Sequence, residues 1–138
     1  MKMKVILIIV LISSIQVYGQ VINSSSNHDI SGRWFWNFDD GKHTSSIELS
    51  TTDNINYSGV YCSIYYNGKT IDCGEDSEVC MTVQRVNNYT FTGTFTSPTY
   101  DGQGSIKLTF LPSENKLQLK ITEGFKEYYL PNNAKYEN

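Results

Sequence analysis

The chain has 138 residues and a formal net charge of −3, with three cysteines, two histidines and no run of basic residues. This length suits one domain that can bury a single core without obligatory metals or disulfides. A mildly acidic chain without clustered Lys and Arg argues against nucleic acid and anionic membrane surfaces as partners.

The first nineteen residues have the layout of a secretory signal peptide. Lys2 and Lys4 form a positive start, an apolar run covers residues 5–12, and residues 17–19 suit a signal peptidase. The run is shorter than the ~20 apolar residues that a spanning helix needs. We therefore expect cleavage after Gly19, a secreted or periplasmic protein, and no stable membrane span once the signal is removed.

The rest of the chain divides into three parts. Residues 20–29 are polar and rich in Ser and Asn, which predicts a flexible arm. Residues 30–131 carry the alternating pattern of a single β-domain, and residues 132–138 are expected to form a tail. Within the domain, short β-rich runs recur with turn residues between them, which is typical of an antiparallel meander.

The first predicted hairpin joins residues 30–38 to residues 43–50 across Asp40-Gly41. Asp-Gly favours a type I′ turn, because both central residues need positive φ. A two-residue loop places Trp34 opposite Ile47, and pattern and turn then agree on one core side. The side chains predicted on that side are Trp34, Trp36, Phe38, Ile47 and Leu49.

The second predicted hairpin joins residues 55–66 to residues 69–73 across Asn67-Gly68. This register places Cys62 opposite Cys73 in a hydrogen-bonded pair, whose Cα spacing a disulfide tolerates. We favour a Cys62–Cys73 disulfide, which leaves Cys80 free. A Cys73–Cys80 bond across a six-residue loop is the rival, and export to an oxidising compartment permits either bond.

A row of tyrosines lies on the other face of this hairpin. Tyr57, Tyr61 and Tyr65 are predicted to point to one face of the strand, and Val60 and Cys62 to the other. With Trp36 they form the candidate ligand-binding surface, because aromatic rings with a polar tip suit sugars, peptides and planar ligands. The competing interpretation is ordinary cross-strand pairing on a solvated outer face.

The second half of the domain continues the meander. A plain two-residue loop at Asn87-Asn88 would mix core and solvent faces, so we expect a bulge or a longer loop there. Threonines at alternate positions over residues 90–96 predict an outer face. The last three predicted strands are residues 105–111, 116–122 and 125–130. About eight or nine short strands favour an all-β, antiparallel, up-and-down barrel, closed or partly open, because closure removes exposed edges.

Gly32-Arg33-Trp34 on the first strand resembles the Gly-x-Trp signature of the calycin barrels. That group includes the lipocalins, the avidin-like proteins and small bacterial metalloprotease inhibitors, in which the Trp closes one end of the barrel near the start of the chain. The resemblance implies a small barrel with a binding role rather than catalysis.

No residue pattern nominates a catalytic centre, a cofactor or a metal site. The two histidines, His28 and His43, lack the Cys/His spacing of a zinc site. Nucleophile-elbow, His-Glu-x-x-His and phosphate-loop motifs do not occur in the sequence. Four carboxylates around Gly74 could hold calcium, but their spacing does not match an EF-hand and favours a solvated acidic loop. They are Asp72, Glu75, Asp76 and Glu78.

The leading hypothesis is a secreted or periplasmic, non-enzymatic, lipocalin-like binding module, expected to be a monomer. The sequence leaves three classes of ligand: a small molecule, a glycan or a protein. One alternative is a calycin-type protease inhibitor that inserts residues 20–29 into a protease cleft. A second alternative is a small secreted hydrolase that uses two carboxylates distant in sequence.

Overall fold

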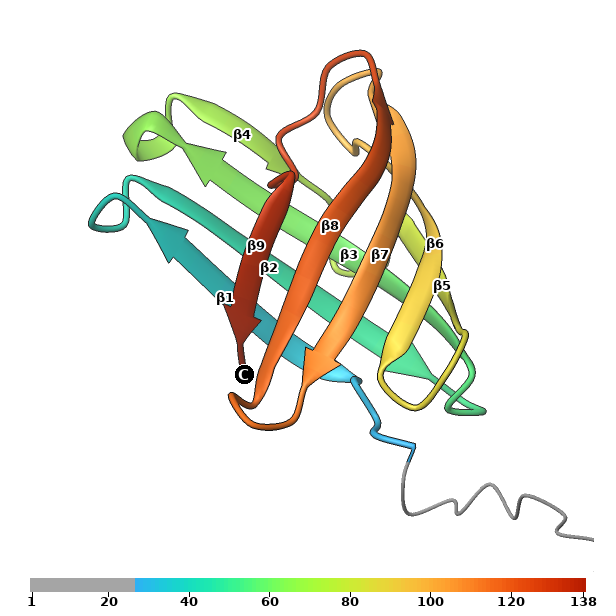
Figure 1. Ribbon diagram of the computed structural model, residues 1–138. Helices are drawn as coiled ribbons and strands as arrows, with labels where there is room; N and C mark the ends of the chain where they lie inside the picture. The colour runs from blue at the N-terminus through green and yellow to red at the C-terminus, as the bar shows by residue number, and fades with distance from the viewer. Residues whose placement is uncertain (1–26) are drawn as a thin grey trace, which may run out of the picture.

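The computed structural model describes residues 27–138, which form an antiparallel β-barrel (Figure 1). The strands are β1 (Gly32–Phe38), β2 (His43–Thr51), β3 (Asn56–Tyr65), β4 (Thr70–Cys73), β5 (Met81–Arg85), β6 (Thr90–Thr96), β7 (Gln103–Leu111), β8 (Lys116–Phe125) and β9 (Asn133–Glu137). Eight of them close into a ring in the order β1-β2-β3-β5-β6-β7-β8-β9, and β4 lies outside the ring, paired with β3 alone. The all-β meander and the barrel predicted from the sequence are confirmed. The predicted signal peptide and most of the predicted arm lie outside the described residues.

Within β1 and β2 the predicted register is confirmed. Trp34 lies opposite Ile47, and Asp40 and Gly41 in the turn have positive φ values of 51° and 83°. Trp34, Ile47 and Leu49 are buried, as predicted. Two residues further along the same face, Trp36 is half-buried, and Phe38 is exposed rather than in the core.

The β3–β4 hairpin keeps its predicted register, with a different turn. Cys62 and Cys73 are opposite each other and form a disulfide, so the predicted bond is confirmed. The connection covers residues 66–69, between the last pair Tyr65 and Thr70, instead of two residues, although Asn67 and Gly68 have the expected positive φ values of 57° and 88°. The Gly74 N–H donates to the Tyr61 carbonyl at 3.0 Å, just outside the cysteine pair. The cysteines therefore occupy a non-hydrogen-bonded pair, where strands approach more closely, and not the hydrogen-bonded pair expected from the sequence.

The longer loop expected between β5 and β6 is confirmed. Met81 pairs with Phe95 and Arg85 with Phe91. This register makes the loop one residue longer than a two-residue turn. The Val86 N–H closes the loop on the Thr90 carbonyl at 2.8 Å. The alternate threonines of β6 point outward, and Phe91 and Phe95 point into the core.

The faces of β3 are the reverse of those expected. Tyr57 and Tyr61 are almost completely buried, and Val60 and Cys62 point outward, partly exposed. The cause is the pairing of β3 with β2, which places Tyr61 beside Ile47 and so on the core side. The turn residues set the register inside each predicted hairpin. The segment between β2 and β3 has no strong turn signal, so the sequence does not show which face of the second hairpin lies on the core side of the first.

The C-terminal part of the chain also differs from expectation. Residues 126–132 form a loop instead of the predicted strand over 125–130, and the predicted tail forms β9, the strand that closes the barrel. β9 pairs with β8 over five residues but with β1 only at Phe35–Glu137. The ring is therefore weakly joined between β1 and β9.

The lower end of the barrel in Figure 1 is closed by the segment before β1. The Trp34 indole N–H donates to the Ile30 carbonyl at 2.9 Å, and the His28 ring stacks on Phe110 with centroids 3.6 Å apart. Arg85 lies over the Phe91 ring and donates to the carbonyl of His28 at 2.6 Å. Trp34 therefore lies at the end of the barrel near the start of the domain, as the calycin resemblance implies. Residues 27–29 are packed against this end, whereas the prediction assigned them to a flexible arm.

The barrel interior is filled with side chains from opposite walls, including the large rings of Trp34, Tyr57, Tyr61, Phe91 and Phe95. Among residues 27–138, every fully buried side-chain nitrogen and oxygen has a hydrogen-bond partner. The Tyr136 hydroxyl, for example, bonds to Ser45 at 2.8 Å, and Ser45 bonds to Ser63 at 2.9 Å. These satisfied hydroxyls allow tyrosines to be buried beside the aliphatic side chains of the core.

Candidate functional site

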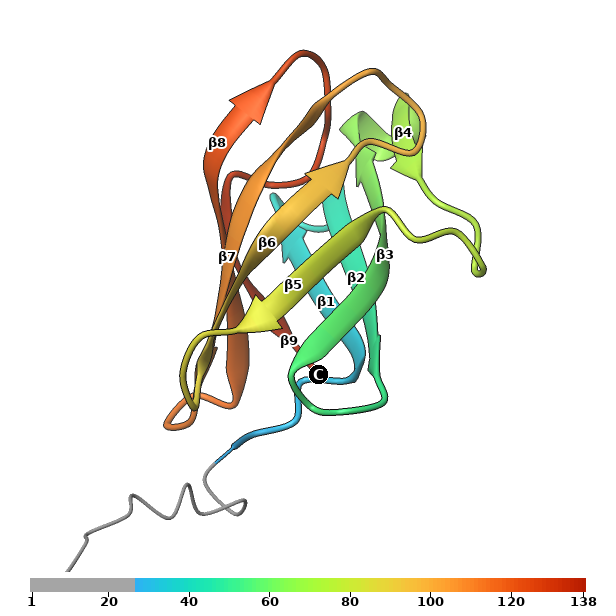
Figure 2. The same ribbon diagram turned by 90° about the vertical axis from the view of Figure 1, so that its right-hand side faces the viewer.

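The upper end of the barrel is built differently from the lower end. In Figure 1 the turns of the β1–β2 and β3–β4 hairpins project to the left, beyond the ring, and Figures 1 and 2 show the 126–132 loop at the top of the barrel. The two turns are tied together by the Asn67 N–H, which donates to the Lys42 carbonyl at 3.1 Å. Since β9 pairs with β1 only at Phe35, the inner face of the projecting hairpins has no wall directly across from it.

A connected group of aromatic side chains covers this inner face and the loops beside it. We call it the aromatic mouth. Its members are Trp36, Phe38, His43, Tyr65, Tyr66, Tyr100 and Tyr129. Phe38 and Tyr66 are 61% and 57% exposed, and the others are partly buried. The mouth therefore offers ring faces to solvent at one end of an otherwise packed barrel.

Tyr65 lies at the centre of the aromatic mouth. Its ring centroid is 4.8 Å from that of His43 and 5.7 Å from that of Tyr129. Burial, and next to it the neighbouring Tyr66, raises the pKa of Tyr65 to about 12. The Tyr65 hydroxyl is therefore neutral at physiological pH and can only donate or accept a hydrogen bond.

A hollow of about 480 Å³ lies beside the aromatic mouth. Tyr65 forms one side of it, and the β8–β9 loop from Lys126 to Asn132 forms the other. The loop can approach closely because Gly102 and Gly124 lack side chains: a Cβ at Gly102 would strike the backbone of Glu127. The hollow thus has the Tyr65 ring on one side and a mixture of charged, aromatic and apolar residues on the other.

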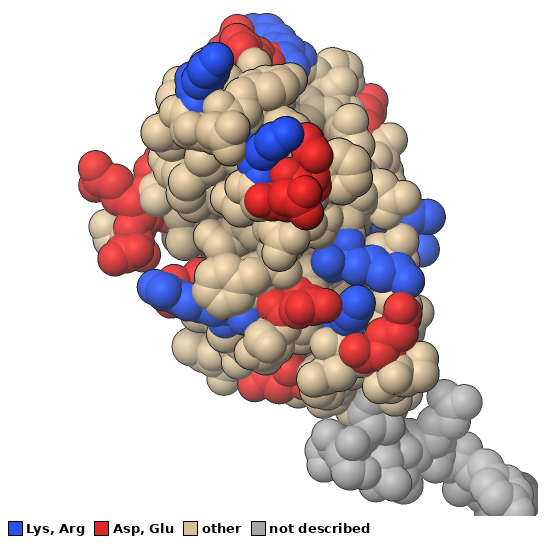
Figure 3. Space-filling model, turned by 90° about the vertical axis from the view of Figure 1, so that its left-hand side faces the viewer, with Lys and Arg blue, Asp and Glu red and all other residues tan. Residues whose placement is uncertain are grey.

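Two pairs of opposite charges lie around the aromatic mouth. Lys42 lies 3.7 Å from Asp39, and Lys126 lies 3.9 Å from Asp101. Figure 3, which views the molecule from the side of the two hairpins, shows Lys and Arg next to Asp and Glu across a largely uncharged surface. Such exposed pairs add little stability, but they leave the surface without a field of one sign, which favours a neutral ligand.

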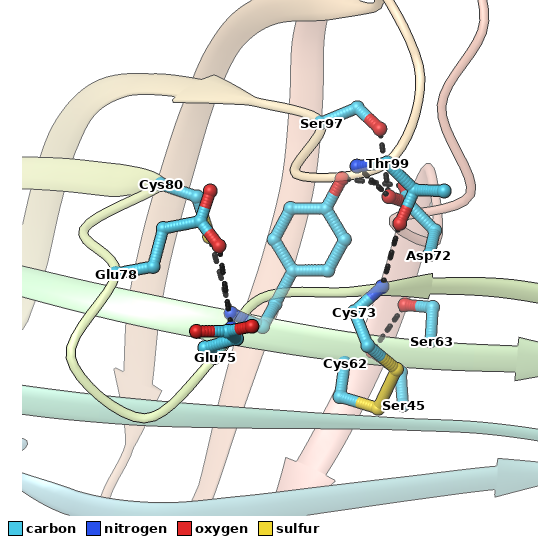
Figure 4. The surroundings of a disulfide bond; sticks show 11 residues. Ser45, Cys62, Ser63, Asp72, Cys73, Glu75, Glu78, Cys80, Ser97 and Thr99 are labelled. Carbon is cyan, nitrogen blue, oxygen red and sulfur yellow. Dashed lines mark hydrogen bonds between the residues drawn. A yellow bond between two sulfur atoms is a disulfide. The ribbon is translucent and has the colours of Figure 1, made fainter.

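Beneath the aromatic mouth lies a fully buried carboxylate, Asp72 (Figure 4). One of its oxygens, Oδ2, accepts from the Tyr61 hydroxyl at 2.7 Å and from the Tyr129 N–H at 2.9 Å. The other, Oδ1, accepts from the Ser97 hydroxyl at 2.7 Å and from the Thr99 N–H at 3.3 Å. Burial, and next to it the Asp72 hydrogen bond, raises the pKa of Tyr61 far above its ordinary value.

Asp72 is thus separate from the acidic loop in which the sequence suggested it lies. Glu75, Asp76 and Glu78 are exposed, whereas Asp72 points into the barrel. In the part of the chain that the structure describes, no group of three or more His, Cys, Asp or Glu side chains is arranged to hold a metal ion. His28 and His43 lie at opposite ends of the barrel, His28 against Phe110 and His43 against Tyr65.

The four predicted ligand-binding residues are split between two environments. Trp36 and Tyr65 belong to the aromatic mouth, with ring centroids 6.5 Å apart. Tyr57 and Tyr61 are core residues, since their hydroxyls bond to Asp29 at 2.9 Å and to Asp72 at 2.7 Å. The single exposed tyrosine face expected from the sequence is therefore wrong, although two of its members lie at the candidate site.

Sequence reasoning missed the rest of the aromatic mouth and the role of Asp72. Phe38, His43 and Tyr66 flank the two predicted turns, so aromatic residues beside both turns were an available signal. The predicted register also pairs Asp72 with Ser63, on the face of Tyr61 and Tyr65. Tyr100 and Tyr129 reach the site through long loops, and no local pattern in the sequence places them there.

A second hollow, of about 580 Å³, lies on the outer face of the sheet. Uncharged polar residues of β2, β3, β5 and β6 line it, among them Ser58, Thr82, Gln84 and Thr92. No ring face is presented there, because the one aromatic residue in its lining, Tyr57, has its side chain in the core. The aromatic mouth is the better candidate site, since binding pockets combine apolar ring surface with a few converging polar groups.

The third cysteine takes no part in the disulfide. Cys80 is buried and free, and burial raises the pKa of its thiol. The Cys62–Cys73 bond is compatible with an oxidising compartment such as the periplasm or the extracellular space. Over residues 27–138, no helix has the length and apolar character needed to cross a membrane.

Comparison with protein-family models, with curated proteins and with solved structures finds no significant match to this chain. The eight-stranded antiparallel ring is compatible with the calycin resemblance of Gly32-Arg33-Trp34. The functional argument therefore rests on the geometry of the aromatic mouth.

Proposed function

We propose that this protein is a secreted, non-enzymatic binding module that holds a neutral carbohydrate on the aromatic mouth. The observation that carries the proposal is the group of seven connected rings at the open end of the barrel, beside a hollow of about 480 Å³. Sugars have apolar C–H faces that lie flat on aromatic rings and hydroxyl edges that need hydrogen-bond partners. Tyrosine supplies both an apolar ring and a polar tip.

The position of the ligand follows from the packing of the barrel. The interior is filled by aromatic and aliphatic side chains, so an internal ligand would have to displace buried rings. The aromatic mouth needs no such displacement, because Phe38 and Tyr66 are already exposed. Ligand sites are usually preformed in this way.

The polar groups at the rim support binding rather than catalysis. Glu127 accepts from the Tyr129 hydroxyl at 3.0 Å, and Asp101 lies 3.9 Å from Lys126. These two carboxylates thus have partners within the protein, and such pairs favour an uncharged ligand over a charged one.

Calorimetric titration with neutral oligosaccharides tests the proposal, with cellohexaose, chitohexaose and maltohexaose as probes. Trp36→Ala should weaken binding of the best probe by about tenfold, equivalent to ~1.4 kcal/mol. Phe35→Ala is the matched control, because Phe35 is the adjacent aromatic residue on the outer face and is 53% exposed. It should leave the affinity unchanged.

Three outcomes would contradict the proposal. One is that none of the three oligosaccharides binds at millimolar concentration. Another is that Phe35→Ala weakens binding as much as Trp36→Ala. The third is that a proline-rich peptide binds the aromatic mouth in place of sugars, because aromatic-lined grooves also recognise that conformation.

A further inference from the structure

The strand that carries Asp72 has only one neighbouring strand. β4 has four residues and pairs only with β3, outside the closed ring. The Cys62–Cys73 disulfide joins β4 to β3 covalently, immediately next to Asp72 (Figure 4). Without that bond, β4 would keep only non-covalent contacts: four residue pairs with β3, and hydrogen bonds of Asp72 and Cys73 to neighbouring segments. A two-stranded ribbon is marginal in water.

Asp72 in turn fixes two loops that carry rings of the aromatic mouth. It accepts from the backbone N–H of Tyr129 directly, and from Thr99, the residue before Tyr100. It also accepts from the Ser97 hydroxyl, which itself accepts from the Tyr100 N–H at 2.9 Å. The ring centroids of Tyr100 and Tyr129 are 5.2 Å apart. One side chain therefore sets the positions of two neighbouring rings.

The carboxylate has no cation to compensate for its burial. Among the described residues, no Lys, Arg or His lies within ion-pair distance of Asp72. A buried charge of this kind is costly unless hydrogen bonds satisfy it, and its four donors come from three separate segments. Those donors lose their acceptor if β4 moves away, and unsatisfied buried groups then favour opening of the loops.

We infer that Asp72 is a positioning residue for the aromatic mouth, and that the Cys62–Cys73 disulfide holds it in place, so that reduction of the bond loosens the site. The consequence for ligand affinity rests on the function proposed above, whereas the consequence for loop order does not. In the reaction, a dithiol reductant supplies two electrons and two protons. The bond between the cysteine sulfurs breaks to leave two thiols, and the reductant becomes a cyclic disulfide.

Amide hydrogen exchange of the full mature chain tests the inference without any ligand. Oxidised wild type is compared with dithiothreitol-reduced wild type and with the Cys62→Ser/Cys73→Ser variant, in which no exchange with Cys80 can occur. Protection of residues 97–101 and 126–132 should fall by about tenfold, as expected for the loss of one hydrogen bond. Protection of β6, β7 and β8 should stay unchanged. Unchanged protection in the two loops, or an equal loss through the whole barrel, would overturn the inference.

A variant of Asp72 separates its role from that of the disulfide. Asp72→Asn replaces one accepting oxygen by an NH₂ group, so two of the four donors lose their acceptor. It should expose the same two loops as reduction does, and Asp76→Asn, on the exposed acidic loop, is the matched control and should expose neither. If Asp72→Asn does not fold, Ser97→Ala removes a single hydrogen bond and should produce a smaller loss in the same loops. Normal protection in every variant would show that Asp72 positions nothing.

The effects of Asp72→Asn and of disulfide reduction on loop protection should also be non-additive. If the disulfide acts through Asp72, reducing the Asp72→Asn variant should expose the loops no further than the substitution alone. Additive losses would contradict this link. With whichever oligosaccharide binds wild type, affinity should fall with loop protection. Loops that open while no sugar binds any form would contradict the proposed function but uphold the inference.

Discussion

The two ends of the barrel use the same kinds of residue in opposite ways. At the lower end, Trp34 is buried, its indole N–H is bonded to Ile30, and the segment before β1 covers it. At the upper end, Trp36 projects from the same face of the same strand and is half-buried among exposed rings. The difference arises from what lies opposite: a covering segment and Arg85 below, and an incomplete wall above. Aromatic content alone therefore does not distinguish a core from a binding surface.

The largest expected effect concerns Trp34. Trp34→Ala should lower the free energy of unfolding by about 3–5 kcal/mol, the usual cost of removing a fully buried large aromatic side chain. Trp36→Ala should cost about 1 kcal/mol, because its ring is only partly buried. Urea melts of both variants measure the difference. Equal losses would mean that the upper end is as tightly packed as the lower end.

Removal of Arg85, which helps to close the lower end, should have the next largest effect on the free energy of unfolding. Its guanidinium donates to the carbonyls of His28, Asn54 and Asn88. Arg85→Ala should lower the free energy of unfolding by about 2–3 kcal/mol, as for the loss of hydrogen bonds from a charged group. Arg85→Lys should restore only part of this, since an ammonium group cannot reach several carbonyls at once.

Arg33 offers the control for this measurement. It pairs with Glu48 at 3.1 Å on an exposed surface, so Arg33→Ala should change the free energy of unfolding by less than about 1 kcal/mol. A loss equal to that of Arg85→Ala would show that charge alone, and not closure of the lower end, accounts for the effect.

Alkaline titration should test the burial of the core tyrosines. Burial, and next to it a hydrogen bond to Asp29, raises the pKa of Tyr57 to about 12, and burial also raises the pKa of Tyr136. The folded state therefore keeps its proton where the unfolded state loses it. The stability that these tyrosines contribute is complete below about pH 10, the pKa in the unfolded chain, and is lost as the pH rises through about 12.

Tyrosinate absorbance followed together with circular dichroism checks this expectation. Tyr57, Tyr61 and Tyr136 should ionise only as the dichroism signal disappears. Ionisation of these three tyrosines near pH 10, with the fold intact, would contradict their burial.

The smallest expected effect on stability comes from the most exposed rings. Phe38→Ala and Tyr66→Ala should each change the free energy of unfolding by no more than about 0.5 kcal/mol, as is usual for surface positions. Both should nevertheless weaken oligosaccharide binding measured by calorimetry. Such a separation of stability from affinity would sharpen the contrast between the ends. A large loss of stability in either variant would show that these rings are structural.

The sequence by itself determined the features that depend on a few neighbouring residues. Asp40-Gly41 set the pairing of Trp34 with Ile47, and the register around Asn67-Gly68 placed Cys62 opposite Cys73. These predictions succeeded because a short loop constrains the register of its own two strands. The outward face of the β6 threonines follows from strand alternation, which is equally local.

Only the tertiary structure decided which face of β3 is buried, which segment closes the ring and which residues meet at the upper end. The inward direction of Tyr61 depends on pairing with Ile47 of another hairpin, and the burial of Asp72 depends on loops far along the chain. β9 is a strand because β8 provides a partner for it. Each of these features requires contacts between residues distant in sequence, and no local pattern carries that information.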